Sequence, residues 1–286
     1  MSAPMETGTS DLSRVFARQI AERKIELPPL PATAAEVMSL CQQDTTDAAK
    51  LSAVIHRDQT IASNVLRVAN SAAYAGQVPC ASLQQAVSRL GMQLITEIAM
   101  AVAVRGRMFA NPKCAELLAA LWKHSVLTGF YCKEIARMRR RNVEIAFLCG
   151  LLHDVGRAVL LNSVDRVLGK DELTLPIGYV LAAIAEQHVP AGLLLAREWK
   201  LPDQIVEAIE CHHDTAAAKR FADMALTVCL ADLLAHFVAP SRLADPVAED
   251  VLRQHPVLVG LNVYPDQLQS LLQMKDRALL VTEGMR

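Results

Sequence analysis

Residues 147–161 read FLCGLLHDVGRAVLL, an apolar stretch that is interrupted by His153, Asp154 and Arg157. Burying a charged or polar side chain costs several kcal/mol unless a partner compensates it. These three residues therefore either satisfy one another inside a core or surround another group, such as a metal ion.

The second half of the chain carries more polar residues inside apolar helical segments. They are His124 in LWKHSVL, His188 in AEQHVPAG, His212 and His213 in IECHHD, and Asp232 in CLADLLA. Imidazoles and carboxylates together suit Zn, Fe, Mn or Co, or a hydroxide-bridged pair of such ions. Because neighbouring helix positions point roughly 100° apart, His153 and Asp154 reach one ion only beside the helix edge, where the aspartate can bridge two ions. The pattern predicts a metal pocket, and the alternative is a core cluster that has lost its ion.

The composition argues against a nucleic-acid or membrane-surface protein. The 286 residues include 29 basic and 30 acidic side chains, so no net charge favours polyanions. Aromatic residues make up only 4%, which leaves little surface for base stacking. Because of the balanced charge and the few aromatic residues, we expect neither nucleic acid nor a membrane as partner. A hydrophobic fraction of 52% predicts a large buried core.

The cysteines and the chain ends predict a cytoplasmic protein. Seven scattered cysteines form no CxxC pair and are typical of reduced core residues. The N-terminal residues MSAPMETGTSDLSR have no apolar signal-peptide segment. The two longest apolar stretches are interrupted by Glu97 and Asp232, so we expect no membrane-spanning segment.

Helix signals dominate, and strand signals are almost absent, which predicts an all-α fold. Capping boxes at Thr33–Glu36 and Ser82–Gln85 open two helices, the second of which is expected to stop at Leu90-Gly91. Prolines divide the rest. We expect helical segments at 115–138, 142–162, 177–186, 190–200, 202–212 and 216–238. The expected parts are an N-terminal helix (1–24), an N-terminal helical subdomain (25–112), a helical core (113–240) and C-terminal helices (241–286).

At the His and Asp positions the sequence resembles the HD superfamily of metal-dependent phosphohydrolases, and more closely its HDOD branch, a bacterial signalling-output version of that fold. The resemblance covers roughly residues 25–240. It rests on LPPLPATAAEVMSL, LRVANSAAYAG and ASLQQAVSRLGMQLITEIAM, followed in order by LWKHS, FLCGLLHDVGRAVL, HVPAGLLLAREWKLPDQIVEAIECHH and ADLLA. It implies a multi-helical HD-type bundle.

The resemblance also implies a set of metal ligands. They are His124, His153, Asp154, His188, His212, His213 and Asp232. These positions are similar to the ligands of the HD-GYP phosphodiesterases, which cleave cyclic di-GMP. Three features depart from those enzymes: the residues after HHD read TAAAKRF and lack the GYP motif, Arg157 replaces a phosphate-binding lysine, and Ala120 offers no carboxylate.

Members of the HDOD type are regarded as regulatory, so the resemblance implies a signal-transduction output module. It would bind a signalling protein partner, with a nucleotide as a possible ligand and a divalent metal (Fe, Mn, Zn or Mg) as a possible cofactor. The alternative is a metal-dependent phosphohydrolase acting on a nucleotide or cyclic dinucleotide, in which Asp154 helps to hold the metal and Arg157 stabilises the anionic transition state. Whether the protein is an enzyme stays open at this point.

One basic run stands apart from these residues. Arg137, Arg139, Arg140 and Arg141 end the helical segment that carries His124. We expect them to be solvated and to complement the negative end of the helix dipole; the alternative is contact with a phosphate group.

Overall fold

The computed structural model describes residues 3–41, 48–167, 176–242 and 246–285, and within these ranges it is helical and contains no strand. The helices in chain order are α1 (Ala3–Ala21), α2 (Ala32–Cys41), α3 (Ala48–His56), α4 (Gln59–Ala69), α5 (Leu83–Met108), α6 (Ala115–Met138), α7 (Val143–Leu152), α8 (Val155–Val167), α9 (Ile177–Glu198), α10 (Asp203–Cys211), α11 (Ala222–Val238), α12 (Glu249–Gln254), α13 (Val257–Gly260), α14 (Pro265–Gln273) and α15 (Lys275–Gly284). Two 3-10 turns, η1 (Pro112–Cys114) and η2 (Thr215–Ala217), complete the described elements. The predicted all-α fold is confirmed.

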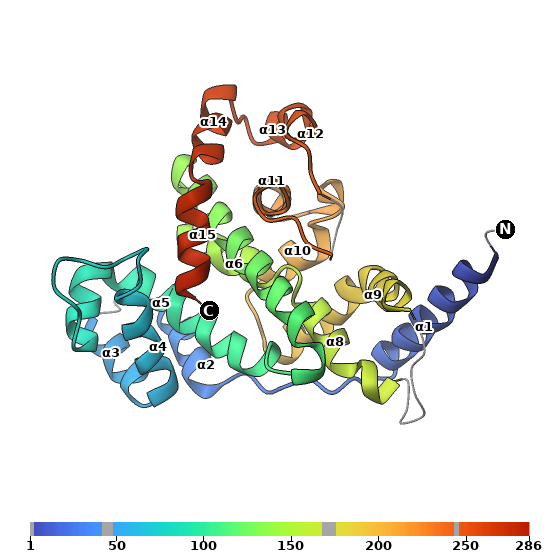
Figure 1. The fold of residues 1–286 in the computed structure, drawn as a ribbon, viewed down its shortest axis with the longest axis horizontal. Coiled ribbons are helices and arrows are strands. Elements are labelled where there is room, and N and C mark those ends of the chain that lie inside the picture. The colour runs from blue at the N-terminus through green and yellow to red at the C-terminus, as the bar shows by residue number, and fades with distance from the viewer. Residues whose placement is uncertain (1–2, 42–47, 168–175, 243–245, 286) are drawn as a thin grey trace.

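Helix α6 lies at the centre of the molecule and packs against α7, α11 and α15 (Figure 1). The N-terminal helices α2, α3 and α4 gather on one side, where they pack against α5. Helix α9 packs against α8 and α1 on the other side. The apolar faces of these helices form one continuous core of buried side chains.

The opening sequence stretch forms two helices, where one continuous segment over 142–162 was predicted. Asn142 caps α7, and its Oδ1 accepts a hydrogen bond from the backbone N–H of Ile145 at 2.9 Å. Helix α7 ends at Leu152 and α8 begins at Val155, so His153 and Asp154 form the junction. No proline or glycine occupies this junction, which is why the periodicity of the apolar residues did not reveal it.

The prediction of two helices around Pro190 is wrong, because α9 runs without interruption from Ile177 to Glu198. A proline inside a helix removes one backbone hydrogen bond and usually bends the helix. Packing of α9 against both α1 and α8 offsets that loss here. Pro176 and Pro202 do mark helix starts, although each is the residue before the first helical one.

Helices α8 and α9 cross at two glycines. A Cβ atom on Gly156 would overlap the carbonyl oxygen of His188 and lie 2.6 Å from the backbone nitrogen of Gly192. Only glycine allows the two backbones to approach this closely. The crossing thereby brings His188 to the residues that begin α8.

The N-terminal helix signals were partly correct. Ser82 caps α5, and its hydroxyl accepts from the N–H of Gln85 at 3.2 Å. The predicted stop is a local break: Gly91 has φ 78°, and helical geometry resumes after it up to Met108. Helix α2 begins at Ala32, which places Thr33 inside the first turn instead of at the cap.

Helices α5 and α9 are long and apolar enough to cross a membrane by length and composition alone. Both pack inside the helical body, where 56% of the most apolar window of α5 and 44% of that of α9 is buried. Within α5, Glu97 forms an ion pair with Lys133 of α6 at 2.6 Å. These features are those of core helices.

The basic run at the end of α6 joins helices together. Arg139 and Arg141 both pair with Asp223 of α11, at 2.6 and 3.5 Å. The Nε of Arg139 also donates to the carbonyl oxygen of Leu261 at 3.1 Å, and Arg137 pairs with Glu134. Three of these arginines are thus in contacts within the fold, which the expectation of a solvated helix end did not include.

The last residues of α15 connect the N-terminal helices to α6. Arg67 of α4 donates to the carbonyl oxygen of Gly284 at 2.9 Å. The carbonyl oxygen of Met285 accepts from Trp122 Nε1 at 3.1 Å and from Arg105 at 3.3 Å. Three helices are therefore tied to one C-terminal turn.

Candidate metal centre

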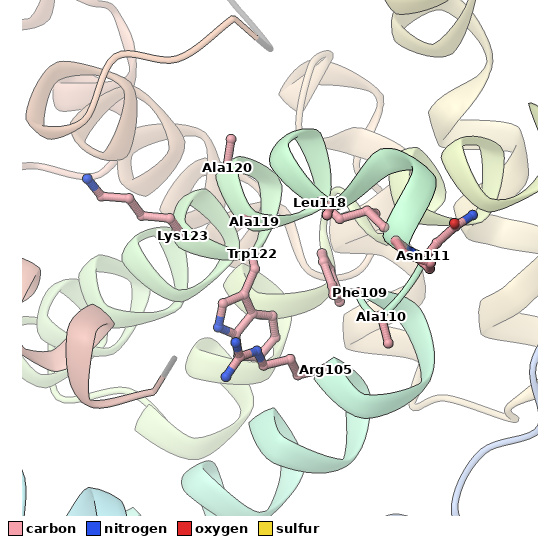
Figure 2. A pocket seen from close by; sticks show the side chains of 11 residues that line it. Arg105, Phe109, Ala110, Asn111, Leu118, Ala119, Ala120, Trp122 and Lys123 are labelled. Carbon is pink, nitrogen blue, oxygen red and sulfur yellow. The ribbon is translucent and has the colours of Figure 1, made fainter.

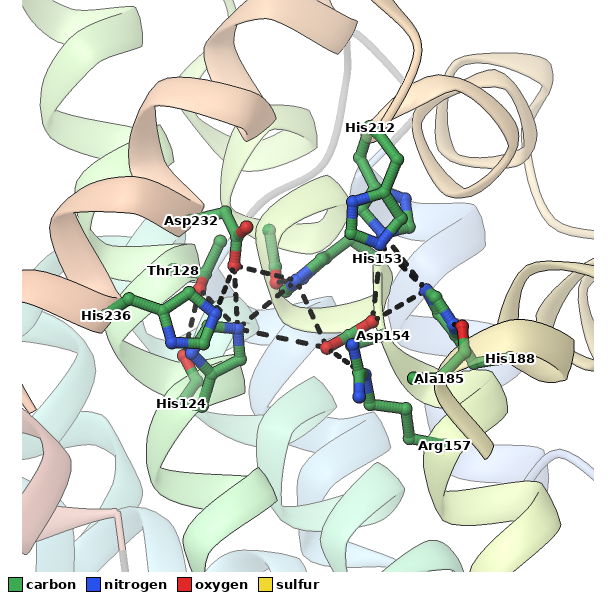
Figure 3. A network of polar contacts seen from close by, with 12 residues as sticks. His124, Thr128, His153, Asp154, Arg157, Ala185, His188, His212, Asp232 and His236 are labelled. Carbon is green, nitrogen blue, oxygen red and sulfur yellow. Dashed lines mark hydrogen bonds and ion pairs between the residues drawn. The ribbon is translucent and has the colours of Figure 1, made fainter. Parts of the chain in front are cut away.

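Six of the seven predicted ligands meet inside the helical body (Figure 3), and the seventh, His213, adjoins them from an exposed position. Helix α6 supplies His124, and the α7–α8 junction supplies His153 and Asp154. Helix α9 contributes His188, the end of α10 contributes His212 and His213, and α11 contributes Asp232. Residues that are more than a hundred positions apart along the chain thus form one buried His/Asp cluster.

The first half of the cluster surrounds one oxygen of Asp154. Its Oδ1 lies 3.3 Å from His188 Nε2 and 3.7 Å from His212 Nε2. His213 completes this group, with its Nε2 3.1 Å from that of His188. We call these four residues the first position.

The second half surrounds Asp232. Its Oδ1 lies 3.0 Å from His124 Nε2 and 3.5 Å from His153 Nε2. The other oxygen of Asp154, Oδ2, is 3.7 Å from His153 Nε2 and 4.0 Å from His124 Nε2. Asp154 therefore presents one oxygen to each half, which is the geometry of a bridging carboxylate. We call the group around Asp232 the second position.

The orientation of three imidazoles is fixed within their own helical turns. The Nδ1 atoms of His153, His188 and His212 lie 2.8, 2.7 and 2.9 Å from the carbonyl oxygens of Gly150, Ala185 and Ile209, each three residues earlier. A carbonyl only accepts, so each Nδ1 carries a proton, and in the neutral ring each Nε2 presents a lone pair to the centre. Metal-binding histidines are oriented in the same way.

These tautomers leave lone pairs facing one another. His188 and His212 approach with their Nε2 atoms 3.3 Å apart, yet neither has a proton to share. Asp154 Oδ1 is buried beside them without a hydrogen-bond partner. A cation among these atoms would satisfy all three, so the residues of the first position fit a divalent metal ion.

The electrostatics of the first position also favour neutral imidazoles beside an ionised carboxylate. Burial lowers the pKa of His188 to about 4 and that of His212 to about 3. Burial opposes ionisation of Asp154, but Arg157 and the nearby histidines outweigh it and hold the pKa of that carboxyl well below its usual range. At neutral pH the ligand atoms of the first position are therefore already deprotonated.

Arg157 is bound to the centre itself. Its Nε forms an ion pair with Asp154 Oδ2 at 2.7 Å, and its side chain is 9% exposed. The resemblance led us to expect a cation turned toward a phosphate group. In this structure the guanidinium lies against the bridging carboxylate (Figure 3).

The sequence analysis missed one member of the cluster, His236. Its Nε2 lies 3.3 Å from Asp232 Oδ1, and its ring stacks on that of His124 with centroids 4.4 Å apart. The signal that could have found it is the spacing: Asp232 and His236 are four residues apart on α11 and share a helix face.

Ala120 lies away from the centre. It lines a surface pocket of about 580 Å³ between the end of α5 and the start of α6 (Figure 2). The pocket also has Arg105, Trp122 and Lys123 in its wall, and no residue of the His/Asp cluster lines it. None of the residues that line this pocket offers a carboxylate in place of the one that Ala120 lacks.

Solvent reaches the centre at few points. His124, His153, Asp154, His188 and His212 are each at most 4% exposed. His213 is exposed, and the Asp232 side chain is 18% exposed. The cluster can admit a small ion, whereas a large ligand would meet it only near these two residues.

Comparisons with known proteins identify the family and the fold of this chain. The pattern that defines the HDOD domain matches residues 27–215. A crystal structure of a candidate metal-dependent phosphohydrolase from Shewanella amazonensis superposes with a TM-score of 0.74, with 20% identity over 98% of this chain and 100% of the other. A candidate signal transduction protein from Marinobacter aquaeolei superposes with a TM-score of 0.71, with 20% identity over 98% of this chain and 66% of the other.

A curated relative comes from Treponema pallidum. This uncharacterised protein is 25% identical over 233 residues, which are 78% of this chain and 45% of the relative. The chain thus spans less than half the length of the curated relatives it matches. At these identities the solved structures show a shared HD-type fold.

Proposed function

This chain belongs to the HDOD domain family, and from that premise we propose that it is a regulatory output module of bacterial signal transduction. In this proposal the His/Asp centre binds divalent metal, and the helical body acts in the cytoplasm by binding a signalling protein. Robust catalysis is not part of the function.

One observation carries the preference for regulation over catalysis: the pairing of Arg157 with Asp154. Hydrolysis at a metal pair needs an open coordination position and a cation that faces the scissile phosphate. Here Arg157 is buried against Asp154 Oδ2, and five of the ligands are nearly inaccessible to solvent. This arrangement supports an ion held inside the fold, with little room for a phosphoester.

The donor set supports particular metals. Five imidazole nitrogens and two carboxylates favour Zn, Fe or Mn over Mg, which prefers oxygen ligands and retained water. Asp154, His188, His212 and His213 would hold one ion, and Asp232 with His124 and His153 would hold another. A bound divalent ion would supply positive charge that balances the two ionised carboxylates.

Elemental analysis of protein purified without chelator or nickel affinity tests the metal part of the proposal. We expect Zn, Fe or Mn, and we expect added Mn²⁺ to raise the unfolding temperature. At a hundred times the dissociation constant, one ion stabilises the fold by about 2.7 kcal/mol. Asp154→Asn should abolish this gain, whereas Asp165→Asn, which changes a surface partner of Lys113, should keep it. A metal-free wild-type protein that Mn²⁺ does not stabilise would contradict the proposal.

A deletion strain tests the regulatory part. Loss of the gene should change a signalling output, and a gene copy that encodes the control variant Asp165→Asn should restore that output. An unchanged output in the deletion strain, together with no protein partner in cross-linked cells, would exclude the regulatory role.

A second function, metal-dependent phosphohydrolysis, is favoured by one specific feature: Asp154 faces both positions with different oxygens, as in two-metal hydrolases. A panel of nucleotides and cyclic dinucleotides, incubated with metal-loaded protein, distinguishes it. Turnover that disappears in Asp154→Asn would replace regulation with catalysis. We expect no turnover by the wild type and none by Asp154→Asn.

A further inference from the structure

The part of the cluster around Asp232 contains more imidazoles than a carboxylate oxygen can pair with. Three Nε2 atoms converge on Asp232 Oδ1: His124 at 3.0 Å, His236 at 3.3 Å and His153 at 3.5 Å. One carboxylate oxygen offers about two lone-pair directions. Hydrogen bonding to Asp232 therefore does not account for all three rings.

In its neutral form His153 does not donate to Asp232. Its Nδ1 proton is committed to the carbonyl oxygen of Gly150 at 2.8 Å, so its Nε2 carries a lone pair. That lone pair faces Asp232 Oδ1 and lies 3.3 Å from His124 Nε2. The atoms around Asp232 thus need a cation at their focus, as the atoms of the first position do.

His236 belongs to this focus by its placement on α11. It follows Asp232 by one helical turn, so its ring and the carboxylate project from the same helix face. The residue is 8% exposed, and its Nδ1 is buried without a hydrogen-bond partner. Among the residues that the structure describes, its one polar partner is Asp232.

The His236 ring is oriented by stacking on His124, whereas the rings of His153, His188 and His212 are oriented by backbone carbonyl oxygens. The rings of His124 and His236 lie 4.4 Å apart at an interplanar angle of 26°. In this stack both Nε2 edges point to the same Asp232 oxygen (Figure 3). Each ring thereby holds the other in an orientation suited to binding one ion.

We propose that His236 is a direct nitrogen ligand of the second metal position, together with His124 and Asp232. The three ligand atoms already lie within 4.8 Å of one another. Arg157 is paired with Asp154 Oδ2, the oxygen that faces the second position, so Asp154 is a weak ligand there. His236 supplies a further donor atom to this position. The inference rests on the proposed metal-binding function and assigns it an additional residue.

Two variants separate direct ligation from a supporting role. His236→Phe keeps a ring that can stack on His124 and removes both nitrogens. His236→Gln keeps a donor for Asp232 and removes the imidazole. The matched control is His56→Phe, because His56 is an exposed histidine outside the cluster.

The measurement is Mn²⁺ binding, followed by the electron paramagnetic resonance of free Mn²⁺ and by calorimetry in chelator-free buffer. We expect two ions in the wild type and in His56→Phe, and one ion in His236→Phe and His236→Gln. The second ion should bind more than about 100-fold more weakly in both variants, because loss of an outer supporting group alone costs about 10- to 100-fold. Circular dichroism confirms that each variant is folded, and His236→Gln decides the question if His236→Phe is not.

Each other result counts against the proposal. Two ions with unchanged affinity in His236→Gln would make His236 a positioning residue for Asp232. A wild type that binds one ion, unaffected by His236→Phe, would also overturn it. A wild type that binds no Mn²⁺ would refute the metal-binding function itself, and this result is visible before any variant is compared.

Discussion

Single residues decide how closely the helices of the centre approach. Gly156 is the sharpest case, because a methyl group there has no space beside the His188 carbonyl and the Gly192 nitrogen. Both neighbours are backbone atoms, so a rotamer change cannot relieve the overlap. Displacing α9 would carry His188 away from Asp154.

Gly156→Ala should therefore destabilise the fold by about 2 kcal/mol or more and abolish the first metal position. Gly178→Ala is the matched control: it lies on the same helix pair, in the first turn of α9, with no neighbouring atom within 4 Å of the new Cβ. It should leave stability within about 1 kcal/mol of the wild type, since alanine is the better helix former. Urea unfolding and Mn²⁺ binding measure both effects. Equal stability of the two variants would contradict the close crossing.

At this scale the sequence identified seven positions that the fold brings together, but it did not identify every member of the cluster. All seven ligand positions assemble, because polar residues inside apolar helices have to find partners. His236 was missed, since a single histidine four residues after an aspartate also fits an ordinary helix face. The ion pair between Arg157 and Asp154 was one of two alternatives that the sequence left open, whereas the resemblance assigned Arg157 to a phosphate group.

At the scale of helices, α5 and α6 are joined by a buried ion pair. Glu97 is 2% exposed and lies 2.6 Å from Lys133 Nζ. Burial raises the pKa of Glu97 from 4.5 to about 7, although Lys133 opposes the shift. Between these two values the folded protein binds more protons at Glu97 than the unfolded chain does.

The free energy of unfolding should accordingly fall as the pH rises from about 4.5 to about 7. The contribution of Glu97 is at most about 1.4 kcal/mol per pH unit. It is fully present below pH 4.5 and is lost once Glu97 ionises in the folded state. Glu97→Gln should remove this part of the pH dependence, while Glu116→Gln, at an exposed position in the first turn of α6, should retain it. Parallel unfolding profiles for wild type and Glu97→Gln between pH 5 and 8 would refute this prediction.

Helix boundaries show where sequence patterns are strong and where packing overrides them. Ser82 caps α5 as predicted, because a side-chain acceptor at a helix start is a local feature. The break at His153 and Asp154 was not predicted, because no proline or glycine at this junction marks it in the sequence. Pro190 was predicted to begin a helix, but the neighbours of α9 hold it continuous.

At the scale of the whole molecule, the last turn of α15 connects the N-terminal helices to the core. Met285 and Gly284 accept hydrogen bonds from side chains of α4, α5 and α6. These contacts join residues that are up to 217 positions apart in sequence. No local pattern could have predicted them.

Trp122→Phe should loosen this connection. Phenylalanine retains the packing against Phe109 but cannot donate to the Met285 carbonyl, so stability should fall by about 1 kcal/mol. Amide hydrogen exchange over residues 281–285 should become faster. Trp199→Phe is the matched control, since it loses a similar bond to the Pro28 carbonyl at 2.8 Å, far from this turn. Unchanged exchange in Trp122→Phe would show that the bond does not hold the helix.

The three Nδ1–carbonyl bonds of the centre have a consequence for the thermodynamics of metal uptake. In His188 and His212 these bonds hold the proton on the outward nitrogen, and both rings are neutral at pH 7, so an arriving ion displaces almost no hydrogen ions from them. The heat of binding at the first position should then be nearly the same in phosphate and in Tris, two buffers with very different ionisation enthalpies. A buffer-dependent heat would mean that the pocket exchanges protons for metal after all.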